Sequence, residues 1–356
     1  MIPKPAIKKA MADFIAAKEI SGAVTLVADG TNIFHLSADG LADIETQMPM
    51  ATDSIFWIAS MTKPITATAV MMMQEEGKLS VDDPVSKYLP EFAGDKAGIT
   101  IKQCLTHTSG LSDLKQEEVK DIGTLAELMP PVIAKPLLFP PGSKWQYCQT
   151  GINTAARIVE VVSGKAFPEF VQERLFDPLG MKDTSFYPVA AQLPRIVPAY
   201  NRTAAGGLEK TELSFLDGKS PSAKDRYPQA NGGLFSTAPD YMQFSQMILR
   251  GGEAGGKRYL KAESVKQMTT VQSGDLAAGF VPGSAWGLGW SIVRGPQGVS
   301  AALSPGSFGH GGKNGTQAWI DPVENRIYLL MIQRADIGNS DGSEIRRAFQ
   351  NTALLP

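Results

Sequence analysis

β-strand patterns gather at the two ends of this chain, and helical patterns fill its middle. Near the start, Gly22–Ala28 and Asn32–Ser37 flank Asp29-Gly30, a dipeptide typical of a tight hairpin turn. Three β-rich segments separated by glycine-rich or Asp-Pro turns occupy the last third: Trp286–Val293, Gln317–Ile320 and Arg326–Gln333. We therefore predict an α+β fold, in which an antiparallel sheet built from both termini is flanked by helices and carries an inserted, mainly helical domain.

Helical spacing of apolar residues marks most of the remaining chain. The predicted helices are Pro3–Lys18, Ser60–Glu76, Gly151–Ser163, Phe167–Leu175, Asp240–Leu249, Lys261–Met268 and Ile345–Leu354, with a weaker one near Leu125–Met129. Pro188–Pro228 reads as a long irregular excursion. At 356 residues the chain exceeds one average domain. We place the sheet domain at residues 1–75 and 230–356, the helical domain at 76–229, and the active site between them.

Composition excludes several classes of function. Apolar residues make up 43% of the chain, charged residues 20%, and the net charge is -2 with no basic run, which argues against nucleic acid as a partner. No apolar window is long enough to span a membrane, and Met1–Lys9 lacks the apolar core of a signal peptide. The two cysteines, Cys104 and Cys148, allow at most one disulfide. They and the three scattered histidines form no metal-binding spacing, so we expect neither metal nor cofactor.

Ser60 and Lys63 are the strongest candidates for chemistry. They lie three residues apart, where an apolar run gives way to a helical pattern, so both side chains share one helix face. A lysine whose pKa is lowered by burial can take the proton of a neighbouring serine. Pro64 fits best in a first helical turn, which places Ser60 near the positive end of the helix dipole. This pattern predicts an acyl-transfer enzyme with Ser60 as the nucleophile.

A second Ser-x-x-Lys match exists at Ser112–Lys115, but it lies in a polar, charge-rich loop with no helical pattern behind it. We therefore expect Ser60 and Lys63 to be the active pair.

Two further stretches offer the remaining parts of such a site. In Lys144–Gln149, the phenol of Tyr147 could relay the serine proton, and the amide of Gln149 could hold a substrate carbonyl. In Phe308–Gly315, glycines let backbone N–H groups approach a substrate, and His310 could donate a hydrogen bond or act as a plain turn residue. His107, within Thr-His-Thr-Ser-Gly, is expected to bond local backbone.

Taken together and in this order, the three stretches resemble the serine β-lactamase and penicillin-binding-protein superfamily. The likeness is closest to class C β-lactamases, DD-peptidases and family VIII carboxylesterases. Matching stretches run along nearly the whole chain: Trp57–Thr68, Ile99–Leu111, Phe139–Gly164, Asn231–Asp240, Trp286–Trp290 and Phe308–Gln333.

The resemblance implies a role for each residue. Ser60 would be acylated, with Lys63 as its base partner and Tyr147 as the tyrosine of the second motif. His310, Gly311 and Gly312 stand where many members have Lys-Thr-Gly, and the backbone N–H groups of Ser60 and Lys313 would form the oxyanion hole.

Two departures bear on specificity: Gln149 replaces the usual Asn or Ser, and His310 replaces the lysine of true β-lactamases. We accordingly expect a serine hydrolase, most simply a carboxylesterase acting on small-molecule esters. The alternatives are a DD-peptidase, D-amino-acid amidase or weak β-lactamase, and, in another class, a catalytically silent ligand-binding or sensor domain. The resemblance favours an exported bacterial protein without fixing the compartment.

Overall fold

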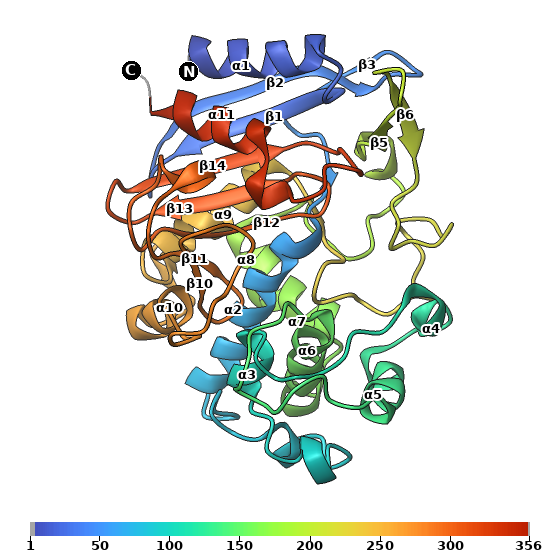
Figure 1. Ribbon diagram of the computed structural model, residues 1–356, viewed down its shortest axis with the longest axis vertical. Helices are drawn as coiled ribbons and strands as arrows, with labels where there is room; N and C mark the ends of the chain where they lie inside the picture. Colours follow the sequence, from blue (N-terminus) through green and yellow to red (C-terminus); the bar gives the residue numbers. More distant parts are fainter. Residues whose placement is uncertain (1–3, 355–356) are drawn as a thin grey trace.

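One eight-stranded antiparallel sheet organises the computed structural model, which describes residues 4–354 (Figure 1). Its strands lie in the order β10-β11-β12-β13-β14-β1-β2-β3. Their bounds are Gly22–Ala28 (β1), Ile33–Asp43 (β2), Met48–Pro49 (β3), Ser284–Trp286 (β10), Ser291–Val293 (β11), Phe308–Gly311 (β12), Gln317–Asp321 (β13) and Arg326–Met331 (β14). β1 pairs with β14, Val24 opposite Met331, so the first and last parts of the chain share one sheet. The predicted α+β fold is confirmed.

Successive side chains of β1 point to opposite faces of the sheet, because side chains alternate along a strand. Ala23 and Val27 pack with α1 (Pro5–Ala16) and α11 (Glu344–Ala353), which lie together on the outer face of the sheet (Figure 1). Val24 and Leu26 join the main core on the inner face. There α9 (Ala238–Leu249) contacts β1, β13 and β14.

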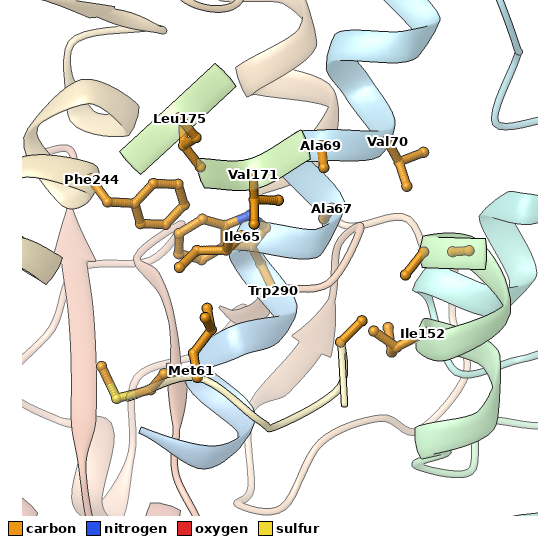
Figure 2. Packing of buried hydrophobic residues seen from close by; sticks show 14 of the residues in the cluster. Met61, Ile65, Ala67, Ala69, Val70, Ile152, Val171, Leu175, Phe244 and Trp290 are labelled. Atoms are coloured by element: carbon orange, nitrogen blue, oxygen red, sulfur yellow. The ribbon is translucent and has the colours of Figure 1, made fainter. Parts of the chain in front are cut away.

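The helix that carries Lys63 is the centre of this core. In α2 (Thr62–Glu75) every residue from Thr62 to Met73 is buried. A helix with no solvent-facing side must be surrounded by protein, and Figure 2 shows Ile152, Val171 and Trp290 packed around it.

The other helices complete the lower part of Figure 1 and the flank of the sheet. They are α3 (Ile101–Leu105), α4 (Gln116–Val119), α5 (Leu125–Ala134), α6 (Gln149–Ser163), α7 (Phe167–Val171), α8 (Asp177–Leu179) and α10 (Ala262–Thr269). Two-stranded pairs join β4 (Phe56–Trp57) to β7 (Phe235–Ser236), β5 (Ala199–Arg202) to β6 (Leu208–Thr211), and β8 (Glu253–Ala254) to β9 (Lys257–Arg258). The domain boundaries near residues 75 and 230 stay a prediction.

Three predicted elements differ from the structure. Trp286–Val293 is not one strand, because the chain turns between β10 and β11 at Gly289, whose φ is +73°. The glycine-rich turn predicted between Val293 and Gln317 contains a strand, β12 (Phe308–Gly311). The excursion at Pro188–Pro228 holds the β5–β6 hairpin. Within residues 4–354, no helix is both long and apolar enough to cross a bilayer.

Candidate active site

Ser60 lies on a single 3₁₀ turn, Ala59–Met61, that leads directly into α2. Ala59 has a φ of +45°, an uncommon conformation for a residue with a side chain. The turn is secured by Thr62, whose hydroxyl donates to the Ala59 carbonyl at 2.7 Å and accepts from the Leu234 amide at 3.2 Å. Strained backbone of this kind is often found at functional sites. Here it places the Ser60 side chain at the wall of a cavity.

Lys63 is fully buried and donates to three acceptors. Its Nζ lies 3.0 Å from Ser60 Oγ, 2.8 Å from Gln149 Oε1 and 2.7 Å from the Asn231 carbonyl. Burial lowers the pKa of Lys63 to about 7 from an ordinary 10.5, although the negative charge of Asp113 acts in the opposite direction. The predicted contact between Ser60 and Lys63 is therefore present, and the amine is a base that is half neutral near pH 7.

Tyr147 covers the same amine with its ring. Lys63 Nζ lies 4.6 Å from the ring centroid, and the phenol hydroxyl hydrogen-bonds with Ser60 and lies 3.4 Å from His310 Nε2. Burial raises the pKa of Tyr147 well above its usual value, and the charges of Asp341 and Asp113 add to the effect. The phenol is consequently neutral at physiological pH and can donate its proton.

His310 is buried on β12, a strand rather than a turn. Its Nδ1 lies 2.8 Å from the Gly311 carbonyl. Because a carbonyl only accepts, Nδ1 carries the proton, and Nε2 of the neutral ring is left to accept from Tyr147. Burial lowers the pKa of His310 to about 3, so the ring is uncharged where a lysine would carry a positive charge.

Gln149 begins α6, and its side chain fixes Lys63. Its Oε1 accepts from Lys63 Nζ and, at 2.9 Å, from Asn231 Nδ2. The oxygen therefore fixes the lysine amine. A substrate carbonyl would accept from the Nε2 side of the same amide, and this predicted contact stays a prediction. The start of α6 is in turn fixed by Asp113, whose Oδ1 accepts the Gln149 amide at 2.7 Å and the Thr150 amide at 2.9 Å.

Asp113 and Asn231 are the site residues that the sequence reasoning missed. Asn231 lay in a stretch that resembles the superfamily, so that stretch offered a signal for it. Asp113 lay inside the rejected Ser112–Lys115 match and offered none.

The cavity in front of Ser60 has a volume of about 800 Å³. Tyr147, His310, Gly311, Gly312, Lys313 and Gln149 line it together with Asn231, Trp57, Phe215 and Phe280. Trp57 and Phe215 are stacked with centroids 4.6 Å apart, which gives one wall an aromatic face. The residues predicted for the site thus line one cavity, apart from Lys63, which is buried behind Ser60.

The glycines of the third stretch are required by close packing. A Cβ on Gly311 would lie 1.8 Å from Asp341 Oδ1, and one on Gly312 would lie 2.0 Å from Thr316 Oγ1. Lys313 follows at the cavity wall, and its side chain donates to Ser214 at 2.9 Å. Its Nζ is thereby directed to the rim.

The rival pair is not assembled. Ser112 Oγ donates to the Pro136 carbonyl at 2.7 Å, and the Lys115 side chain is exposed and near Glu117. Cys104 and Cys148 are both buried and unpaired. In the part of the chain that the structure describes, no group of His, Cys, Asp or Glu is arranged to hold a metal ion.

Comparison with known proteins gives a consistent picture. The sequence profile of the Beta-lactamase family matches residues 7–352. Protein Rv1367c of Mycobacterium tuberculosis is 32% identical over 349 residues, covering 88% of this chain and 86% of that protein. Esterase EstB of Burkholderia gladioli is 28% identical, covering 91% and 88%. The structure of EstCE1, described as a hydrolase with promiscuous acyltransferase activity, superimposes with a TM-score of 0.84 at 26% identity, covering 98% and 97% of the two chains. The chain belongs to the β-lactamase family and is a serine hydrolase of that family.

Proposed function

We propose that this chain is a carboxylesterase that forms an acyl-enzyme on Ser60, with Lys63 as the base and Tyr147 as the proton donor to the leaving alcohol. The observation that carries the proposal is the fully buried Lys63 amine, 3.0 Å from Ser60 Oγ, with a pKa of about 7. At neutral pH half of these amines are unprotonated and able to accept the serine proton. Tyr147 can act as the acid, because its raised pKa keeps the phenol protonated.

The reaction then follows in two balanced halves. Neutral Lys63 takes the proton of Ser60 as Oγ attacks the ester carbonyl, and the oxyanion is stabilised by the backbone N–H groups proposed at Ser60 and Lys313. When the carbon–oxygen bond breaks, the alcohol takes the Tyr147 proton, and protonated Lys63 returns a proton to the phenolate. In the second half a water molecule gives a proton to Lys63 and its oxygen attacks the acyl carbon. When the bond from this carbon to Ser60 Oγ breaks, protonated Lys63 returns the proton to Oγ and the acid leaves.

Two features support an ester over a lactam or peptide substrate. His310 is neutral, so this position offers no fixed positive charge to the free carboxylate that penicillins and D-alanyl peptides carry. The cavity presents an aromatic wall at Trp57 and Phe215, which suits an uncharged acyl or alcohol group. The names of EstB and EstCE1, an esterase and a hydrolase, agree with this choice.

The test compares the wild type with Ser60→Ala on p-nitrophenyl butyrate, nitrocefin and a D-Ala-D-Ala peptide in parallel. We expect turnover of the ester to exceed that of the other two, and the alanine variant to lose about 10⁴-fold or more in kcat. A fluorophosphonate should label Ser60, as mapped by mass spectrometry. Preferred turnover of the peptide or nitrocefin would replace the esterase assignment, and failure of all substrates and of labelling would favour the binding-domain alternative.

A further inference from the structure

We propose that His107 is a positioning residue for the reaction. It accepts hydrogen bonds from the backbone amides on both sides of Tyr147, and its ring packs against the Tyr147 ring. The inference rests on the proposed catalytic role of Tyr147. His107 itself touches neither Ser60 nor the substrate cavity, so it would act through the tyrosine.

Two hydrogen bonds and one ring contact join His107 to the segment around Tyr147. The His107 carbonyl accepts from the Gln146 amide at 2.9 Å, and His107 Nδ1 accepts from the Cys148 amide at 3.1 Å. Between these two bonds, the imidazole and the Tyr147 ring lie with centroids 4.4 Å apart. Residues 144–148 form no helix or strand, so Tyr147 has no regular backbone ladder to fix its height above Lys63. The hydrogen bonds from the Gln146 and Cys148 amides to His107 fix the position of Tyr147 instead.

His107 also carries two costs that simple space-filling does not explain. Its φ is +60°, a conformation that is unfavourable for a residue with a side chain. It is fully buried, and among residues 4–354 its Nε2 has no hydrogen-bond partner. A buried polar group without a partner is also destabilising. An apolar side chain would avoid the second cost but could not accept the Cys148 amide.

The aromatic surroundings explain how the ring is held. The imidazole meets Trp286 edge-on at 5.0 Å and Trp145 edge-on at 6.0 Å. Trp286 in turn contacts His310 at 5.4 Å, and Phe280 contacts Tyr147 at 4.7 Å. His107 is therefore the inner member of a set of rings that surrounds Tyr147 and reaches His310.

The charge of His107 is consistent with this role. Burial lowers its pKa well below the ordinary value, and the positive charge of Lys63 lowers it further. The ring is thus neutral wherever the enzyme works. Its Nδ1 remains an acceptor, and it brings no second positive charge near Lys63.

The experiment measures kcat and KM for p-nitrophenyl butyrate in His107→Ala, His107→Asn and a matched control, His35→Ala. His35 is also fully buried, and its Nδ1 also accepts a backbone amide, that of Lys4 at 2.8 Å, but it lies on β2. Displacing a reacting group by about 1 Å costs on the order of 10²-fold in rate. We expect H107A to lose about 10²-fold in kcat with KM little changed. H35A should lower the melting temperature but keep kcat within about twofold of the wild type.

His107→Asn is the conservative variant. The Asn side-chain oxygen can accept the Cys148 amide, and Asn tolerates a positive φ, so this variant should fold and recover kcat to within about 10-fold of the wild type. A kcat for H107N no better than that of a folded H107A would overturn the proposal.

A double-mutant cycle with Tyr147→Phe tests whether His107 acts through the tyrosine. We expect the loss caused by H107N or H107A to disappear in the Y147F background. A loss of the same size in both backgrounds would overturn the proposal, whichever His107 variant folds better. An inactive wild type, or a Y147F enzyme with full activity, would instead contradict the proposed function.

Discussion

Esterase activity should be switched on by deprotonation of Lys63, with a midpoint near pH 7. Burial moves the pKa of this amine from 10.5 to about 7. At pH 7 about half of the enzyme then holds a neutral base, whereas an amine with the ordinary value would be neutral in only about 3 of 10,000 molecules. Because the neutral form is active, kcat/KM should rise about tenfold per pH unit below the midpoint and level off above it.

His310 and Tyr147 titrate outside this pH range. The pKa of His310 is about 3, below the range of the assay, and the pKa of Tyr147 is raised well above its usual value. A single ionisation should therefore describe kcat/KM between pH 5 and pH 9. The assay follows p-nitrophenyl butyrate at the isosbestic wavelength of p-nitrophenol and subtracts the rate of the Ser60→Ala variant at each pH. A profile that is flat across this range, or one that still rises steeply at pH 9, would refute Lys63 as the base.

Asp113→Asn perturbs the same midpoint in a defined direction. The carboxylate of Asp113 raises the pKa of Lys63, so its removal should shift the midpoint to lower pH, while the Asn oxygen can still accept the Gln149 amide. Asp121→Asn removes an exposed carboxylate and serves as the control for the change in net charge. A midpoint that moves upward in D113N, or that moves equally in both variants, would contradict the electrostatic account.

Three further predictions concern the surroundings of the site. Ser112→Ala should keep kcat within about twofold of the wild type, because this hydroxyl bonds only a backbone carbonyl at the surface; a loss comparable to that of Ser60→Ala would revive the rival pair. Gly289→Ala should lower the free energy of unfolding by about 1–3 kcal/mol and reduce kcat as well, since φ is +73° and the new Cβ would lie 2.8 Å from a side-chain carbon of α2 and 3.0 Å from the Lys63 carbonyl. Thermal denaturation and ester kinetics check both effects, and unchanged values would contradict this packing. Cys104 and Cys148 should resist a thiol reagent in the native enzyme and react as two thiols after denaturation, because both are buried and burial raises the pKa of Cys104 to about 12; fast native labelling would contradict their burial.

Local patterns predicted the parts of the site that depend on local structure. Ser60 and Lys63 share one turn, so their spacing alone implies contact, and the structure places them 3.0 Å apart. The contacts of Gln149 Oε1 with Lys63 and Asn231 were not predicted, because both residues are distant from Gln149 in sequence. No periodicity in the sequence reports such a contact.

Glycine explains why one strand was missed. Glycine is disfavoured in strands, so a glycine-rich turn was predicted between Val293 and Gln317 and no strand at Phe308–Gly311. At Gly309, however, an added Cβ would lie 2.2 Å from the Ala318 carbonyl and 2.7 Å from the Trp319 ring. Packing of the neighbouring strand, which a single-sequence pattern does not contain, decides the conformation here.

The pairing of β1 with β14 bears on how the enzyme is made. Val24 meets Met331, so the middle of the sheet cannot close until the chain through Met331 has left the ribosome. Until then β1 can pair with β2 on one side, but its other edge is open, an arrangement prone to intermolecular association. Such long-range contacts also slow folding. A nascent chain that ends before β14 therefore contains Ser60 and Lys63, but β12, which carries His310, is not yet joined to β1 through β13 and β14. We expect chaperones to affect the yield of folded enzyme more than the activity of the folded molecules.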